Sequence, residues 1–227
     1  MRDRDITIGL YLLTAVCGIV DAATFLGLGN VFAEIMTGNL MFLAFRTGQG
    51  ELSSALPIYL TPLAFFSAGA VGCGYLLWTR RIAGRRRLGF VVVCVLVWAA
   101  AILALWWEPE APTTQATVVV GVLAFAMGMQ NAMVLYHVVP DVATNVMTLT
   151  LVRLLSNWSV IGGDNSRWHF RVASLATFFA AAAVGAFLLR FGVGVTLAAA
   201  ALVYVVALPI LLLGHSTADA KHRAPAA

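Results

Sequence analysis

Polar side chains that could bind a cation or a small solute lie inside stretches of this sequence that are otherwise apolar. Asp21 lies about two thirds of the way along the apolar stretch 7–27. An ionisable side chain costs about 2.5–3.5 kcal/mol at the centre of a bilayer, so we expect it to face the protein interior. There it could bind a proton or a cation, or it could form an interhelical hydrogen bond that holds a bundle together.

Two shorter apolar stretches, 31–45 and 142–155, carry most of the other candidates. Asn30 and Asp141 precede them and are good N-cap residue types, so a short helix is predicted to begin after each. Such helices would point amide-rich N-termini into the protein at membrane depth. The alternative is a pair of interfacial helices that simply fill the bundle. The predicted substrate- or ion-binding residues are Asp21, Glu34, Thr37, Asn39, Gln130, Asn131, Asn145, Thr148 and Thr150.

The composition places these residues in a membrane protein. Hydrophobic residues make up 61% of the 227 positions and charged residues 11%, with a mean hydropathy of +0.92, whereas about 25% of residues are charged in a soluble domain. The stretch 31–45 would extend only about 22 Å as a helix, against roughly 30 Å of hydrocarbon. The sequence therefore predicts an all-α, polytopic membrane helix bundle, with six transmembrane helices plus two short re-entrant or half helices. The six stretches long enough to span a bilayer are 7–27, 58–78, 88–107, 116–138, 170–190 and 192–213.

The distribution of basic residues predicts the topology. Five arginines fall in the short segment 80–87, between two apolar stretches. With six crossings and that segment in the cytoplasm, 12 of the 14 basic residues lie inside and 2 outside, whereas eight crossings would leave 6 inside and 8 outside. Because cytoplasmic loops carry an excess of Lys and Arg, we expect six crossings, with both termini in the cytoplasm. The same rule explains the net charge of +4, so no nucleic-acid partner is expected.

The two halves of the chain resemble each other at offsets of 110 to 113 residues. Gly18 corresponds to Gly128, and "FFSAGAVG" at 65–72 corresponds to "FFAAAAVG" at 178–185. Since each half holds three spans, the second half must be inverted, an arrangement typical of a central transport site. The alternative is that duplication only built a stable bundle. We predict one integral membrane domain over 1–227, with repeat 1 about 7–107, repeat 2 about 116–213 and a cytoplasmic tail 214–227.

Small residues four positions apart predict where helices approach closely. Such faces favour helix packing in lipid, where no hydrophobic drive brings helices together. They could pack within one chain or form the seam of a homodimer. The predicted packing residues are Gly18, Ala22, Ala68, Gly72, Gly128, Ala132, Ala181 and Gly185.

No pattern in the sequence supports catalysis. There is no nucleophile elbow, no zinc-protease motif and no phosphate-binding glycine loop, so we do not expect an enzyme. Cys17, Cys73 and Cys94 lie in apolar stretches without metal-ligand spacing. No metal site and no cofactor is predicted.

Three motifs carry a resemblance to a known family: "G-x-x-D-A" at 18–22, "F-x-x-x-M-T-G-N" at 32–39 and "G-x-Q-N-A" at 128–132. With them, the chain resembles the YoaK family of small bacterial multi-pass membrane proteins, whose domain has no known function, over roughly residues 7 to 213. The resemblance implies the bacterial cytoplasmic (inner) membrane and about six helices. It implies no substrate and no catalytic residues.

The residues and the repeat together predict a small-solute transporter or channel with a central site between inverted repeats. Its partners would be the lipid bilayer and a small polar or cationic solute. The alternative is a non-transporting membrane assembly or partner-binding protein, in which the polar groups only hold helices together.

Overall fold

The structure is a computed structural model and describes residues 2–79, 84–136, 147–158 and 168–222. Its described residues contain helices and no strand, which confirms the predicted all-α class. The helices are α1 (Arg2–Gly27), α2 (Met36–Gly48), α3 (Leu52–Thr79), α4 (Gly84–Trp107), α5 (Thr114–Tyr136), α6 (Met147–Ser156), α7 (Trp168–Leu188), the short 3-10 helix η2 (Leu189–Phe191) and α8 (Val193–His222).

Six of these helices are long and apolar enough to cross a membrane, as predicted. They are α1, α3, α4, α5, α7 and α8, and their apolar parts run for 20 to 24 residues. A helix satisfies every backbone hydrogen bond within its own segment, which is why such apolar stretches fold as helices in lipid. Helices α2 and α6 have 13 and 10 residues and extend only about 20 Å and 15 Å, so neither can span.

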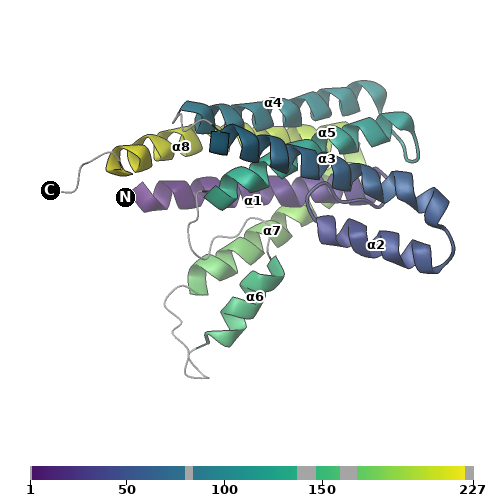
Figure 1. The fold of residues 1–227 in the computed structure, drawn as a ribbon, viewed down its shortest axis with the longest axis horizontal. Helices are drawn as coiled ribbons and strands as arrows, with labels where there is room; N and C mark the ends of the chain where they lie inside the picture. The colour runs from purple at the N-terminus through teal and green to yellow at the C-terminus, as the bar shows by residue number, and fades with distance from the viewer. Residues whose placement is uncertain (1, 80–83, 137–146, 159–167, 223–227) are drawn as a thin grey trace.

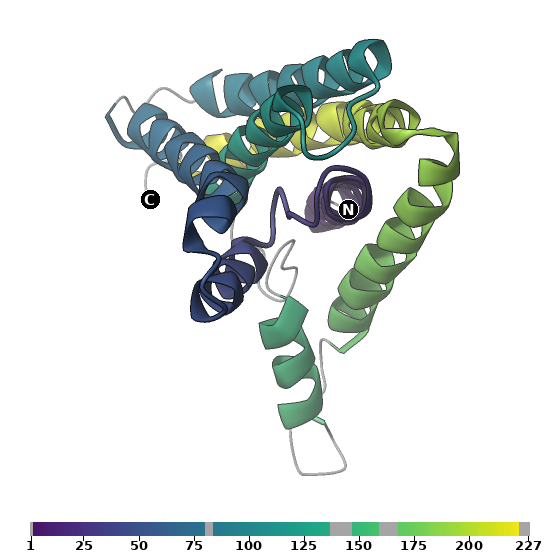
Figure 2. The same cartoon turned by 90° about the vertical axis from the view of Figure 1, so that its right-hand side faces the viewer.

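Helix α1 lies at the centre of the bundle and packs against α7 and α8. Helix α5 packs against α3 and α4, and α4 packs against α8. In Figure 2, α1 is flanked by α8 and α7, whereas α6 and one end of α7 stand away from the other spans. The interior side chains of α1, such as Leu13, Val16 and Val20, are fully buried. Thr14, Asp21 and Thr24 of α1 are buried as well and therefore face protein.

Both chain ends lie at the same end of the bundle (Figure 1). The connection between α4 and α5 and the connection between α2 and α3 lie at the opposite end. An even number of crossings requires this arrangement, and six spans provide it.

The contacts between helices follow the same pattern in the two halves of the sequence, α1–α4 and α5–α8. The contact of α1 with α7 corresponds to that of α5 with α3, and the contact of α1 with α8 corresponds to that of α5 with α4. The ancestral duplication and its inversion stay predictions, because no comparison tests them.

Glycines mark the closest approaches between spans. A Cβ on Gly18 would lie 2.8 Å from the Phe178 carbonyl oxygen of α7, and one on Gly128 would overlap the Phe66 carbonyl oxygen of α3. Gly185 packs against Ile19 and Ala22, and Ala181 is buried beside Gly18. Ala132 packs against the core from α5. These six predicted packing residues therefore lie at helix contacts.

The prediction for α3 was wrong. Ala68 is exposed, and a Cβ on Gly72 would meet no atom within 4 Å. The face of α3 that packs on α5 lies one position further along, at Gly69, whose Cβ would overlap the Phe125 carbonyl oxygen. Small residues are frequent enough in this segment to form a stripe on either face, so their spacing alone selected the wrong one.

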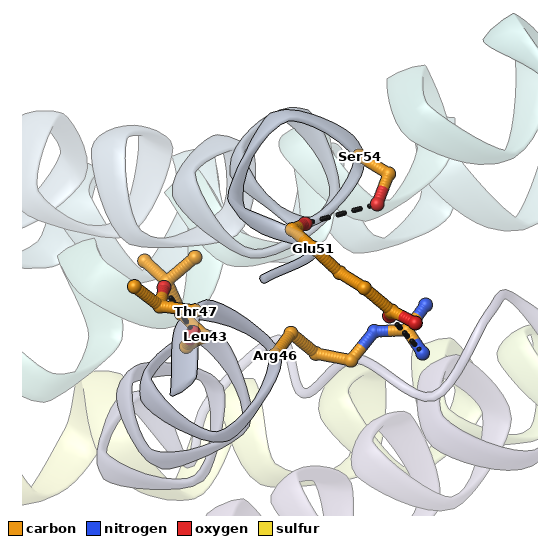
Figure 3. Close-up of polar contacts among 5 residues, drawn as sticks. All are labelled: Leu43, Arg46, Thr47, Glu51 and Ser54. Carbon is orange, nitrogen blue, oxygen red and sulfur yellow. Dashed lines mark hydrogen bonds and ion pairs between the residues drawn. The ribbon is translucent and has the colours of Figure 1, made fainter. Parts of the chain in front are cut away.

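A surface ion pair closes the turn between α2 and α3 (Figure 3). Arg46 and Glu51 approach to 2.7 Å, with both side chains nearly half exposed, and Gly50 turns the chain at φ +82. The Thr47 hydroxyl donates to the Leu43 carbonyl and the Ser54 hydroxyl to the Glu51 carbonyl. An exposed pair of this kind contributes at most about 1 kcal/mol, so the turn rests on its backbone geometry.

Candidate functional site

The connection between α1 and α2, residues 28–35, turns back into the bundle and contacts Asp21. The Asp21 carboxylate oxygen Oδ1 accepts hydrogen bonds from the backbone N–H groups of Ala33 and Glu34, at 3.0 and 2.9 Å. Asp21 lies six residues before the last residue of α1, which is about 9 Å along a helix. The chain therefore dips below the end of α1 before α2 carries it back to the start of α3.

The turn that starts this connection corrects the prediction for Asn30. The residue has φ +58, in the left-handed region, and follows Gly29 at φ +103. Helix α2 begins only at Met36, after Ile35, and has no side-chain cap. Asn30 is therefore a turn residue and not a helix cap, because the chain first passes through the non-helical segment 31–35, which contacts Asp21.

Asn39 holds the connection from the other side. Its side-chain Oδ1 accepts from the Phe32 backbone N–H at 2.9 Å, and its Nδ2 donates to the Phe32 carbonyl at 2.7 Å. Gly38 lets the Phe32 ring lie against the helix, because a Cβ there would come within 2.7 Å of the ring. The Gly–Asn pair of the "MTGN" motif therefore fixes the connection.

Glu34 enters the interior beside Asp21. Its side chain is 5% exposed, and neither carboxylate oxygen accepts a hydrogen bond from the residues that the structure describes. The Cys17 thiol of α1 and the Asn131 amide of α5 lie close to it. Glu34 lies outside the six spans, and burial, with the charge of Asp21 second, raises the pKa of its carboxyl well above the usual range.

Helix α5 contributes Gln130 and Asn131 to the same place. Gln130 is fully buried and donates from Nε2 to the Cys17 sulfur at 3.1 Å. Its side-chain oxygen Oε1 has no hydrogen-bond partner among the described residues, and neither has Asp21 Oδ2. Asp21, Glu34, Gln130 and Asn131 thus form one buried group around Cys17, which we call the carboxyl–amide cluster.

Two members of this neighbourhood were missed from the sequence. Cys17 lies one helical turn before Asp21, so the i, i+4 spacing could have revealed that they share a face. Tyr204 of α8 is fully buried near Cys17, and its hydroxyl has no partner within the described part of the chain. No local pattern links Tyr204 to α1.

The other candidates do not belong to the cluster. Thr37 and Thr148 are exposed, at the starts of α2 and α6. Thr150 is buried on α6, which packs against α7. Asp141 and Asn145 lie outside the described residues.

Two further features surround the connection. The rings of Phe25 and Phe32 stack with centroids 4.6 Å apart, and Phe42 stacks next to them and on Tyr59. On another side, Val31 lines a pocket of about 70 Å³ between the connection, α3, α5 and the segment 111–113.

Comparison with known proteins identifies the family. The model of a family described as a protein of unknown function (DUF1275) matches residues 9–209. No curated protein and no solved structure matches the chain. The match covers nearly the whole bundle, including the connection and the carboxyl–amide cluster, and agrees with the family resemblance seen in the motifs. The chain therefore belongs to the DUF1275 family of proteins of unknown function.

Proposed function

We propose that the protein is a transporter or channel for a small polar or cationic solute, with the carboxyl–amide cluster as its central site. The observation that carries this proposal is the buried pair Asp21 and Glu34, three of whose four carboxylate oxygens have no hydrogen-bond partner among the described residues. Buried polar atoms are normally satisfied, and ionisable groups at membrane depth commonly mark substrate or ion pathways.

Three threonine hydroxyl groups of the spans provide the contrast. Thr14 donates to the Leu10 carbonyl and Thr61 to the Pro57 carbonyl, each within its own helix, and Thr196 donates to the carbonyl of Gly192, the residue before α8. A polar group retained only for packing is satisfied in this way. Three carboxyl oxygens of the cluster have no such partner among the described residues, which favours a role that needs free acceptor atoms.

The arrangement of the elements supports the same proposal. A segment that returns to the side it came from, at the level of a buried carboxylate, is tolerated where it is enclosed in protein or lines an aqueous cavity. The sequence repeat favours inverted halves that meet at such a site. The excess of basic residues at one end favours the bacterial inner membrane with both termini in the cytoplasm.

The test is flux through purified protein in proteoliposomes. Labelled small cations, amines and neutral polyols are screened for uptake above that of protein-free vesicles. We expect Asp21→Asn and Glu34→Gln to lower uptake of the active solute at least about tenfold, the effect of losing about 1.4 kcal/mol of binding. Glu51→Gln, which makes the same change at an exposed carboxyl, should keep the wild-type rate.

Both variants must first elute as single species in detergent, so that a loss of flux is not a loss of folding. Full uptake by folded Asp21→Asn and Glu34→Gln protein would remove the cluster from the mechanism. If no solute in the screen enters protein-containing vesicles faster than protein-free vesicles, the protein does not transport these classes of solute and the proposal is wrong.

A second function is favoured by one observation. Asp21 Oδ1 and the Asn39 amide are both used to hold the connection, as expected in a non-transporting membrane assembly or partner-binding protein, or in a homodimer. In that case Asp21→Ala, which removes both hydrogen bonds of Oδ1, should unfold the protein or change its oligomeric state, and the wild type should show no flux. Size-exclusion chromatography with light scattering separates the two outcomes.

A further inference from the structure

We propose that the carboxyl–amide cluster binds a small cation with a single positive charge, held by side-chain oxygen atoms of α1, α5 and the α1–α2 connection. The proposal deepens the proposed function and relies on it only for the route by which the cation reaches the site.

The unsatisfied atoms define what the site can bind. Asp21 Oδ2, both carboxylate oxygens of Glu34 and Gln130 Oε1 are buried without a hydrogen-bond partner in the described part of the chain. All four are acceptors when the acids are ionised. Gln130 Nε2, which could donate to a carboxylate, already donates to the Cys17 sulfur. A ligand that contacts these four oxygens must therefore supply donors or positive charge, and the Asn131 amide also lies close to Glu34.

The charges in the cluster point the same way. Two carboxyl groups lie together, and neither is paired with an arginine or lysine among the described residues. The two backbone N–H groups at Asp21 Oδ1 partly compensate one negative charge. Glu34 receives no backbone N–H donor from the described residues, and the Cys17 thiol and the Asn131 amide lie close to it. Since an isolated buried charge is unfavourable, one positive charge next to Glu34 would stabilise its ionised carboxylate.

The number of oxygen atoms indicates a monovalent cation. Ca²⁺ takes about 6–8 oxygen ligands, and Mg²⁺ requires octahedral geometry and keeps several waters. The cluster offers four unsatisfied side-chain oxygens, on three residues that are themselves buried, Asp21, Glu34 and Gln130. A compact ion of charge +1, either an alkali ion or ammonium, needs fewer ligands than Ca²⁺ or Mg²⁺ and less negative charge to balance its own.

Occupation of the site should stabilise the fold, because its ligands come from separate elements. Glu34 is part of the connection, whereas Asp21 and Gln130 belong to two different spans. A cation that contacts all three would hold the connection against α1 and α5. A ligand that binds only the folded state raises its stability as the ligand concentration rises above the Kd.

Thermal unfolding of the purified full chain in detergent tests the proposal. Chloride salts of Na⁺, K⁺, NH₄⁺ and the large cation N-methylglucamine are compared at constant ionic strength and fixed pH. We expect at least one small cation to raise Tm relative to N-methylglucamine, with a concentration dependence that saturates. The increase should persist in Glu51→Gln and disappear in Glu34→Gln.

A second variant keeps the test valid if Glu34→Gln does not fold. Gln130→Met removes one oxygen from the site at similar volume and without a change of charge, and should raise the half-saturating cation concentration about tenfold. An equal Tm in all salts, or an unchanged half-saturating concentration in Gln130→Met, would overturn the proposal. So would a Tm that responds to pH but to none of the cations, because the occupant would then be a proton alone.

The failure of this proposal can be told apart from the failure of transport. Saturable stabilisation by a cation without flux of any solute would keep the cation site and exclude the transport function. Flux that depends on Asp21 and Glu34, in a protein that no cation stabilises, would keep transport and exclude the cation site.

Discussion

At the scale of the residue, Asp21 uses its two carboxylate oxygens differently. Oδ1 accepts two backbone N–H groups of the connection, whereas Oδ2 has no partner among the described residues. An amide at this position would keep one acceptor oxygen and lose the charge. Asp21→Asn can therefore separate the two roles, because the Oδ1 contacts with Ala33 and Glu34 can persist while binding at Oδ2 is lost.

Asn39 is predicted to stabilise the protein rather than to bind solute. Asn39→Ala removes two hydrogen bonds to the Phe32 backbone. The partly buried N–H and carbonyl of Phe32 then lose these partners, at a cost of up to about 1–3 kcal/mol for each group left unsatisfied. We expect a lower Tm and faster hydrogen exchange in residues 31–35.

The matched control is Asn157→Ala. Asn157 makes one hydrogen bond, to the Arg153 carbonyl, at an exposed position, so its loss should change stability by less than about 0.5 kcal/mol. An Asn39→Ala protein as stable as Asn157→Ala, with unchanged exchange in the connection, would contradict the role assigned to Asn39.

The sequence allowed part of this site to be predicted. An acid in an apolar span must face protein, and that rule was enough to select Asp21. The paired partners could not be predicted, because they include backbone N–H groups of Ala33 and Glu34, which any sequence would provide. Asn30 illustrates the same limit, because its residue type suits a helix cap. The left-handed turn at Gly29 and Asn30 is needed only because the chain returns to Asp21, a long-range contact that the local sequence does not reveal.

At the scale of the element, close helix packing depends on which face carries the small residues. Gly128 lies against the Phe66 carbonyl, so Gly128→Ala must push α3 and α5 apart. Overpacking of this kind typically costs about 1–3 kcal/mol. We expect Gly128→Ala to lower Tm in detergent.

Gly72→Ala is the control, because a Cβ there would meet open space. Alanine is also a better helix former than glycine, so this variant should be as stable as the wild type or slightly more stable. If Gly72→Ala were the more damaging change, the packing face of α3 would be the predicted stripe at Ala68 and Gly72 after all.

The six spans were predictable because their length and apolar composition are dictated by the bilayer. The face that each span presents to its neighbours was harder to predict. In a soluble helix, polar residues mark the exposed face, whereas in lipid both faces are apolar: α3 exposes Phe65 and Val71. Only small residues then mark the packing side, and on α3 they occur on both.

At the scale of the whole molecule, the basic residues and the position of the chain ends agree. The predicted cytoplasmic side holds both termini and the segment 80–87, and in Figure 1 the two termini lie together at one end of the bundle. The turn between α2 and α3 lies at the other end. The apolar stretch 31–45 fits this six-span topology without crossing the membrane. The chain enters the bundle as far as Asp21 and returns to the same side through α2.

Cysteine labelling can test this topology, because Cys17, Cys73 and Cys94 are buried and should give little background. Gln49 is exposed in the turn between α2 and α3, and Ala226 lies in the C-terminal tail. We expect a membrane-impermeant maleimide, added to intact cells with a permeabilised outer membrane, to label Gln49→Cys but not Ala226→Cys. Lysis should expose both.

The two positions separate six crossings from eight. If both short stretches crossed while the segment 80–87 stayed in the cytoplasm, the tail would lie outside with Gln49, and both cysteines would react in intact cells. That result would also place Glu34 inside a complete span and not in a returning connection. Labelling of Ala226→Cys only after lysis would instead leave the connection on one side of the membrane, as its contacts with Asp21 require.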